Sequence, residues 1–142
     1  DFVGISIYAV QQLKNIGITN TQNLYAHVLT KPDRQQLAQT TGIEYAEIVE
    51  LTKLTDLSRI KWVGATYARL LYDIGVASVA QVVASAPEEL HAALQTRIRE
   101  HAIFKGGIGI HDVKILIESA RMVPLEIQYD NINDNVKHTN DL

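Results

Sequence analysis

The sequence contains no cysteine among its 142 residues, which excludes a disulfide framework, a thiolate zinc site and a cysteine nucleophile. Tryptophan and methionine occur once each, phenylalanine twice and proline three times. No apolar run approaches the roughly 20 residues that a membrane-spanning helix needs, so we expect no membrane partner and a cytoplasmic protein. The chain opens Asp1-Phe2 with no methionine and no signal-peptide pattern, which indicates a processed chain or a piece of a longer one.

The charges show no strong excess of either sign. Lys and Arg number 13 against 16 Asp and Glu, and the formal net charge is −3. A pI near 5.9 argues against a protein that grips nucleic acid along its whole surface. However, residues 126–142 hold four acidic side chains and one basic one, so residues 1–125 carry 12 of each sign. The body of the chain is neutral, and nucleic-acid binding through a limited surface stays open.

Helical spacing of apolar residues dominates the sequence, and alternation typical of strands is scarce. In the segment 63–74, for example, apolar residues recur three and four positions apart, which predicts one buried stripe on a helix. An apolar fraction of 46% is sufficient for a globular core. We therefore predict an all-α fold. The expected helices are 4–15, 20–29, 32–40, 43–54, 56–61, 64–73, 78–85, 87–101 and 110–123.

Local residues support several of these boundaries. Asn20 and Ser78 are of the type that caps helix N-termini, and Ser78 with Gln81 fits a capping box. Pro32 and Pro87 suit the first turn of a helix. After the last expected helix, Leu125, Ile127 and Tyr129 alternate as in an extended segment, which we expect to pack on the helices, and residues 130–142 are expected to form a loose polar tail.

The chain reads as two copies of one pattern. Val3-Gly4-Ile5 matches Val63-Gly64-Ala65, and Ile16-Gly17-Ile18 matches Ile74-Gly75-Val76. Further along, Lys31-Pro32 matches Ala86-Pro87 and Gly42-Ile43 matches Gly109-Ile110. The offset grows from 55 to 67 residues between these last two pairs, which indicates a 12-residue insertion in the second copy. We therefore expect one unit at 1–56, a second at 57–124 and an extended polar tail at 125–142, with the two units packed on each other because each is too small for a core of its own.

The segment Leu57-x-x-Ile60-x-Trp62-Val63-Gly64-x-x-x-Ala68-x-x-Leu71 resembles a helix-hairpin-helix motif. Related segments are Phe2-Val3-Gly4, Thr41-Gly42-Ile43 and Gly107-Ile108-Gly109. Residues 2–123 together resemble an uncharacterised bacterial family of tandem helix-hairpin-helix repeats. The resemblance implies two short-helix hairpin units, similar to SAM and helix-hairpin-helix bundles, and non-specific binding of the DNA backbone by hairpin amides.

The second copy contains the fullest version of this motif. Only Gly107-Ile108-Gly109 has both glycines of the turn, whereas Phe2, Trp62 and Thr41 stand where the first glycine is expected. Backbone N–H groups at such a turn form an anion site where a helix begins. We therefore predict a phosphate site at Lys105, Gly107 and Gly109, assisted by Gly64, Lys61 and Arg69. The alternative is a turn that only joins two packed helices.

Three further features have open interpretations. Lys53, Arg59, Lys61 and Arg69, with Arg97, Arg99 and Lys105, either form a basic face or belong to a surface of mixed charge. Trp62 either stacks on a base or anchors a partner, or it covers the interface between the units. His101 and His111 flank the glycine turn, but the chain shows no set of metal ligands with recognisable spacing.

No nucleophile-base pattern, paired carboxylates or phosphate-binding loop is recognisable, so we expect neither an enzyme nor a cofactor. The leading hypothesis is a non-catalytic module that binds nucleic acid, with duplex DNA as the expected partner and contacts to its phosphate backbone. The alternative is a protein-interaction or scaffold module in which Phe2 and Trp62 face another protein.

Overall fold

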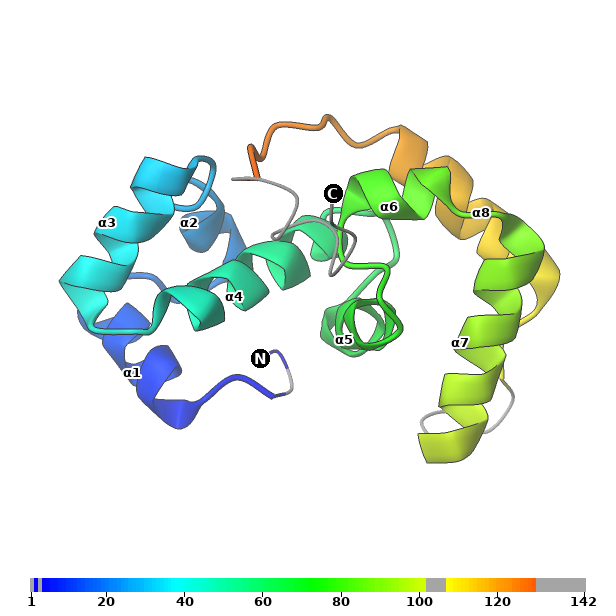
Figure 1. The fold of residues 1–142 in the computed structure, drawn as a ribbon, viewed down its shortest axis with the longest axis horizontal. Coiled ribbons are helices and arrows are strands. Elements are labelled where there is room, and N and C mark those ends of the chain that lie inside the picture. Colours follow the sequence, from blue (N-terminus) through cyan, green and yellow to red (C-terminus); the bar gives the residue numbers. More distant parts are fainter. Residues whose placement is uncertain (1, 3, 102–106, 130–142) are drawn as a thin grey trace, which may run out of the picture.

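The computed structural model describes residues 2, 4–101 and 107–129, and within them the chain forms helices and connecting turns only. Helices at the two ends of an elongated molecule are joined by α4, which runs between them (Figure 1). The eight helices of these residues are α1 (Ile7–Asn15), α2 (Thr21–Tyr25), α3 (Lys31–Thr41), α4 (Tyr45–Ser58), α5 (Ala65–Asp73), α6 (Val79–Ala84), α7 (Pro87–His101) and α8 (Ile110–Arg121). The predicted all-α class is confirmed.

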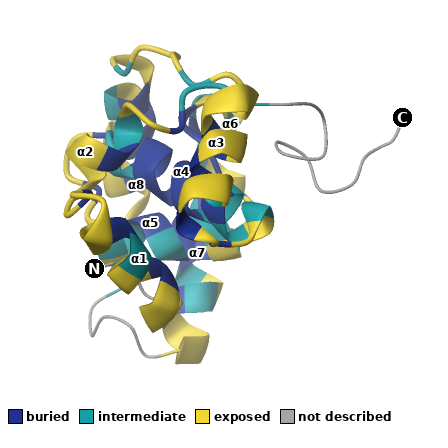
Figure 2. Ribbon diagram, turned by 90° about the vertical axis from the view of Figure 1, so that its left-hand side faces the viewer, coloured by how far each residue is buried: buried dark blue, intermediate teal, exposed yellow. Residues whose placement is uncertain are grey.

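The central helix α4 corrects the expectation of two helices at 43–54 and 56–61. Residues 45–58 form one continuous helix, which passes through the expected unit boundary after residue 56. Neither glycine nor proline interrupts this stretch, and all seven residues from Leu51 to Leu57 are buried. Burial on all sides gives this stretch packing energy across the position where a second helix was expected to start, so a local preference for a helix start at residue 56 is overridden. Figure 2 shows α4 as the buried centre of the fold.

Two apolar clusters form the core, and α4 contributes to both. Ile48 and Leu51 belong to the cluster of the first four helices. Leu54 and Leu57, one turn further along α4, belong to the cluster of the last four helices. Phe2 packs against both clusters and is half-buried. The two halves of the chain therefore share one central helix and one N-terminal segment.

The two groups of four helices have corresponding internal contacts. α4 packs on α2 and α3 as α8 packs on α6 and α7, and α1 contacts α3 as α5 contacts α7. Gly17 and Gly75, both at positive φ, end α1 and α5 with the same pair of hydrogen bonds from the residues after the helix to carbonyls of its last turn. Asn20 and Ser78 cap α2 and α6 through their side chains, as predicted.

Four turns, each leading into a helix, share one backbone conformation. A residue at positive φ is followed by an apolar residue that packs on the core and then by an extended residue at which the helix begins. The four turns are Gly4-Ile5-Ser6, Gly42-Ile43-Glu44, Trp62-Val63-Gly64 and Gly107-Ile108-Gly109.

This conformation corrects the expected matching of the two copies by two residues. Trp62 has the backbone role of Gly4, not of Phe2, and the offset of 58 residues equals that between Gly17 and Gly75. Gly107 likewise has the role of Gly42, so the offset there is 65 residues. Glycine stands at the positive-φ position in some of these turns and at the extended position in others. A comparison of the sequence alone therefore aligns residues that have different backbone conformations.

Residues 124–129, which we call the strap, extend from the end of α8 across to the first helices (Figure 1). The Gln128 amide donates to the Leu29 carbonyl at 2.7 Å, and the buried Arg34 donates to the Gln128 carbonyl at 2.7 Å. The Tyr129 hydroxyl donates to Asp56 of α4 at 3.0 Å. The strap therefore joins the end of the last helix to both α3 and α4. The expected loose tail at 130–142 lies outside the described residues.

Candidate functional site

Trp62 lies at the surface in a strained backbone conformation. Its φ is +76°, and it is the sole non-glycine residue of the described part of the chain at positive φ. An L-residue in this region costs roughly 1–2 kcal/mol relative to ordinary backbone. Its side chain stays 78% exposed, so the interpretation of Trp62 as a cover over the interface between the units is wrong. The half-buried Phe2 has that position.

Lys61 precedes this tryptophan and is also exposed. Its ammonium lies 5.1 Å from the centroid of the indole ring, within the range of a cation–π interaction. Lys61 forms no ion pair with any residue that the structure describes. The turn therefore presents a positive charge beside a large aromatic ring.

Gly64 begins α5 in an extended conformation, with φ −95° and ψ −169°. No side chain of the described residues caps this helix N-terminus, and its first turn contains no acidic residue. The first N–H groups of a helix have no partner within the helix and carry a partial positive charge. A Cβ added at Gly64 meets no atom within 4 Å, so space remains in front of the turn.

The turn at Gly107-Ile108-Gly109 is built differently, because two side chains of α7 hold it. Gln95 accepts a hydrogen bond from the Ile108 amide at 2.8 Å, and a ring nitrogen of His91 lies 2.7 Å from the Ile108 carbonyl. The Gly109 amide donates to the carboxylate of Asp112 at 3.1 Å. The N–H groups of Ile108 and Gly109 are thus already used within the protein, and Asp112 adds a negative charge at the start of α8.

The structure separates the other predicted site residues. Lys105 lies outside the described residues. Arg69 pairs with Glu50 of α4 at 2.7 Å and with Asp73 at 3.4 Å, so its charge joins α4 to α5. The basic residues that could have formed one face are separated as well, because Lys53 is buried. Arg59 pairs with Asp56, and Arg97 with Asp73. Of the predicted positions, Lys61 and Gly64 are brought together at one turn.

A pocket of about 250 Å³ lies beside Trp62, between the two turns of the last four helices. We call it the Trp62 pocket. It is lined by Lys61, Trp62, Val63, Tyr67, Ile108, Asp112, Ile115 and Leu116. Burial and then the neighbouring charge of Asp112 raise the pKa of the Tyr67 hydroxyl above its ordinary value of 10.0, which keeps this hydroxyl protonated.

Sequence reasoning did not identify Tyr67, Asp112 or Ile115 as members of a site. Asp112 has one local signal, because an acid three residues after Gly109 fits the pattern of a helix cap. Tyr67 and Ile115 match only the apolar face of a helix, and their approach to Trp62 depends on how α5 and α8 are placed by the core.

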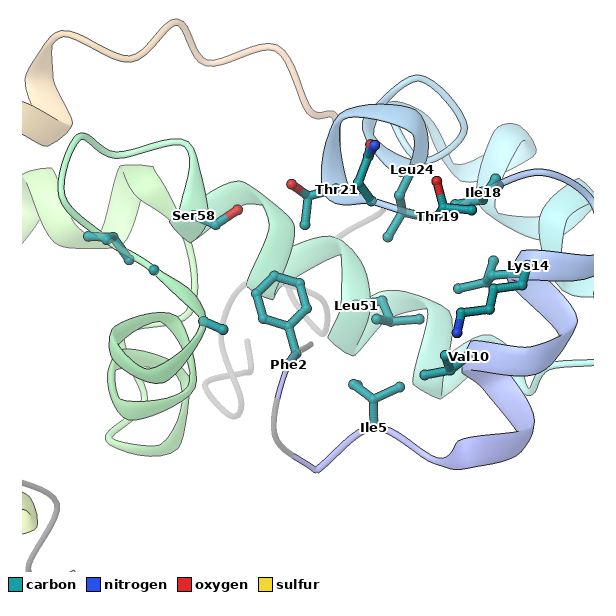
Figure 3. Close-up of a pocket in the computed structure, with 15 residues that line it drawn as sticks. Phe2, Ile5, Val10, Lys14, Ile18, Thr19, Thr21, Leu24, Leu51 and Ser58 are labelled. Atoms are coloured by element: carbon teal, nitrogen blue, oxygen red, sulfur yellow. The ribbon is translucent and has the colours of Figure 1, made fainter.

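A second, central pocket of about 440 Å³ lies on the other side of the same turn. Figure 3 shows Phe2 beside α4, Leu51 of α4 next to it and Lys14 of α1 on the side of the pocket away from Phe2. Gly64 and Ala65 complete the wall formed by the last four helices. Most residues that line the pocket are apolar. Among the polar ones, Asn20 already accepts a hydrogen bond as the N-cap of α2.

No group of three or more His, Asp or Glu residues in the described ranges is arranged to hold a metal ion. Within the same ranges, no helix combines the length and the apolar character that a membrane crossing requires.

Comparison with known proteins identifies a family. No curated protein matches the chain, and no solved structure matches it. A family model matches residues 4–123, which span the eight helices described above. The chain belongs to that family, described as Domain of unknown function (DUF4332).

Proposed function

We propose that this protein is a non-catalytic module that binds nucleic acid, and that residues 61–66 make its contacts with the phosphate backbone. One observation carries the proposal. The ammonium of Lys61 lies beside the exposed ring of Trp62, and the uncapped first turn of α5 follows directly in the chain, with Gly64 and Thr66 exposed. Cations and helix N-termini bind phosphate, and exposed aromatic rings bind bases.

The tandem helix-hairpin-helix architecture is part of this proposal. It is supported by the four turns of equal conformation and by the corresponding contacts within the two groups of four helices. In a helix-hairpin-helix unit the turn brings backbone amides to the surface, where a phosphate oxygen can approach them.

The proposal places the leading contact at α5 and not at α8. Although Gly107-Ile108-Gly109 has the fuller glycine motif, Asp112 already accepts the Gly109 amide hydrogen, so that amide is not available to an anion. The first turn of α5 consists of Ala65, Thr66, Tyr67 and Ala68, which are all uncharged. Lys61 beside it adds a favourable interaction with phosphate.

The proposal is tested by fluorescence anisotropy with a labelled DNA duplex that has a single-stranded overhang, at low salt. We expect affinity in the micromolar range that falls steeply as salt is added, because few phosphates are contacted and counterions are released. Absence of binding at tens of micromolar protein would rule the proposal out.

The substitution Thr66→Glu tests whether DNA contacts the first turn of α5. Thr66 is exposed at the second position of α5, and a carboxylate there stabilises the helix by about 0.3–1 kcal/mol while it repels phosphate. We expect stability to be kept and DNA affinity to fall. The matched control is Ala80→Glu, at the second position of α6 and equally exposed, which should leave DNA binding unchanged. Equal effects of the two substitutions would place the contact elsewhere.

A protein-interaction module is the second candidate function. Its supporting observation is that Trp62 and Ile115, exposed by 78% and 43%, line one pocket, and apolar side chains grouped at a surface favour protein contacts. A stable dimer in light scattering that Trp62→Ala dissociates, together with no DNA binding, would favour this function.

A further inference from the structure

The lining of the Trp62 pocket combines three chemical features. Lys61 supplies a positive charge, and Asp112 supplies a carboxylate. Val63, Ile108 and Leu116, which are all at most 9% exposed, supply apolar surface. A ligand that complements the whole pocket needs an anion, a flat apolar ring and a hydrogen-bond donor on that ring.

The size of the pocket suits one ring system. A cavity of about 150 Å³ accommodates benzene, and the Trp62 pocket has about 250 Å³. Trp62 and Tyr67 both line it, so aromatic surface is available for stacking on a planar ligand.

From this complementarity we infer that the Trp62 pocket binds an unpaired nucleobase that carries an exocyclic amino group. The inference rests on the proposed function and defines the class of nucleic acid bound. The phosphate attached to that nucleotide lies toward Lys61 and the first turn of α5, and the base stacks on the Trp62 indole. Asp112 uses one carboxylate oxygen, Oδ2, for the Gly109 amide, and a carboxylate retains further acceptor capacity for the amino group.

A continuous duplex does not supply such a ligand. Each of its bases is stacked between neighbours, and the amino groups of cytosine and adenine are engaged in base pairs. Removing a base from the stack costs free energy, whereas single strands, overhangs and frayed ends offer bases without this cost. The module therefore prefers single-stranded nucleic acid, and among bases it prefers cytosine or adenine over thymine.

Trp62 is the sole tryptophan of the chain, so its fluorescence reports directly on the pocket. The intact protein is titrated at low salt with single-stranded oligo(dC), single-stranded oligo(dT), a blunt duplex and inorganic polyphosphate. We expect strong quenching by oligo(dC), weaker quenching by oligo(dT), and little quenching by the duplex or by polyphosphate, because only unpaired bases stack on the indole.

Variants separate stacking from phosphate binding, with anisotropy of labelled oligonucleotides as the readout. Trp62→Ala is expected to lower the affinity for oligo(dC) by about 5- to 150-fold and to lower the affinity for blunt duplex much less, while Trp62→Phe, which keeps an aromatic ring, is expected to retain most of the oligo(dC) affinity. Asp112→Asn introduces a donor and is expected to reduce the preference for oligo(dC) over oligo(dT). The matched control is Met122→Ala, which removes an 83% exposed apolar side chain at the other end of α8.

The outcomes distinguish this inference from the proposed function. If all the nucleic acids bind equally, leave Trp62 fluorescence unchanged and are unaffected by Trp62→Ala, the base-binding inference is overturned and the proposed function stands. If none of them binds at low salt, both are overturned. If Trp62 fluorescence instead changes with protein concentration alone, the pocket is occupied by a second copy of the chain and the inference is wrong.

Discussion

Replacing Asp56 by alanine is expected to lower the free energy of unfolding by about 4 kcal/mol. Asp56 is 4% exposed on α4 and accepts three hydrogen bonds from different parts of the fold. The donors are Arg59 at 2.8 Å, the backbone amide of Val79 at the start of α6 at 3.1 Å, and the hydroxyl of Tyr129 in the strap at 3.0 Å. One carboxylate thus joins three segments.

The magnitude follows from the donors that the substitution leaves behind. Val79 is fully buried and the Tyr129 hydroxyl is part-buried, so each donor costs about 1–3 kcal/mol when it is left without its acceptor. Arg59 contributes less, about 1 kcal/mol, because its side chain is 18% exposed and also donates to the Pro124 carbonyl. Asp56→Asn keeps one acceptor oxygen, so we expect it to lower the free energy of unfolding by about half as much as Asp56→Ala.

The measurement is urea denaturation followed by circular dichroism of the helices. The matched control is Glu118→Ala, which removes an exposed carboxylate paired with Arg121 and should change stability by less than about 0.5 kcal/mol. A double variant, Asp56→Ala with Tyr129→Phe, should lose about 1 kcal/mol less than the sum of the single variants, since they share one hydrogen bond. A loss below about 1 kcal/mol for Asp56→Ala would refute the role of this carboxylate as a junction.

Three further predictions concern the turns and the strap. Trp62→Gly should be more stable than Trp62→Ala by about 1 kcal/mol in urea denaturation, because only glycine relieves the positive φ; equal stabilities would mean that the backbone is not strained. Gly107→Ala should lower stability by about 1–3 kcal/mol, since its φ is +72° and its Cβ would lie 2.5 Å from the Gln95 side chain, whereas Gly64→Ala, at negative φ with open space around the Cβ, should cost only about 0.5 kcal/mol; similar losses would contradict the geometry of the two turns. Burial and Asp56 raise the pKa of Tyr129 above 10.0, so stability that is complete below about pH 10 should fall above it by up to about 1.4 kcal/mol per pH unit. Tyr129→Phe should remove that slope in denaturation series on both sides of pH 10, and an unchanged slope would assign it to other groups.

The sequence predicts most helices because their ends carry local signals. Asn20 and Ser78 cap the helices that follow them, and Pro32 and Pro87 lie in first turns, as local chemistry requires. The continuity of α4 could not be read in the same way, because burial of Leu54 and Leu57 by other segments decides it.

The candidate site was predicted less well than the fold. Lys61 and Gly64 lie three positions apart in the chain, so their proximity follows from the sequence. Arg69 was expected in the same site, but an ion pair with Glu50 on another helix holds it, and no local pattern reveals that partner. Gly109 belongs to the turn that has both glycines of the motif, but its backbone amide already donates a hydrogen bond to the carboxylate of Asp112. A motif identifies a turn, but the neighbouring side chains determine whether its amides are available to a ligand.

The position of α4 has a consequence for how the molecule opens. Because this helix supplies Ile48 and Leu51 to one cluster and Leu54 and Leu57 to the other, neither half can unfold without exposing apolar surface of the other. The strap adds a second link, since Arg34 of α3 and Asp56 of α4 bind its neighbouring residues Gln128 and Tyr129. We therefore expect the chain to unfold as one cooperative unit, with amide hydrogens of α4 exchanging with solvent only when the entire fold opens. The corresponding contacts of the two groups of four helices do not make either group independent of the other.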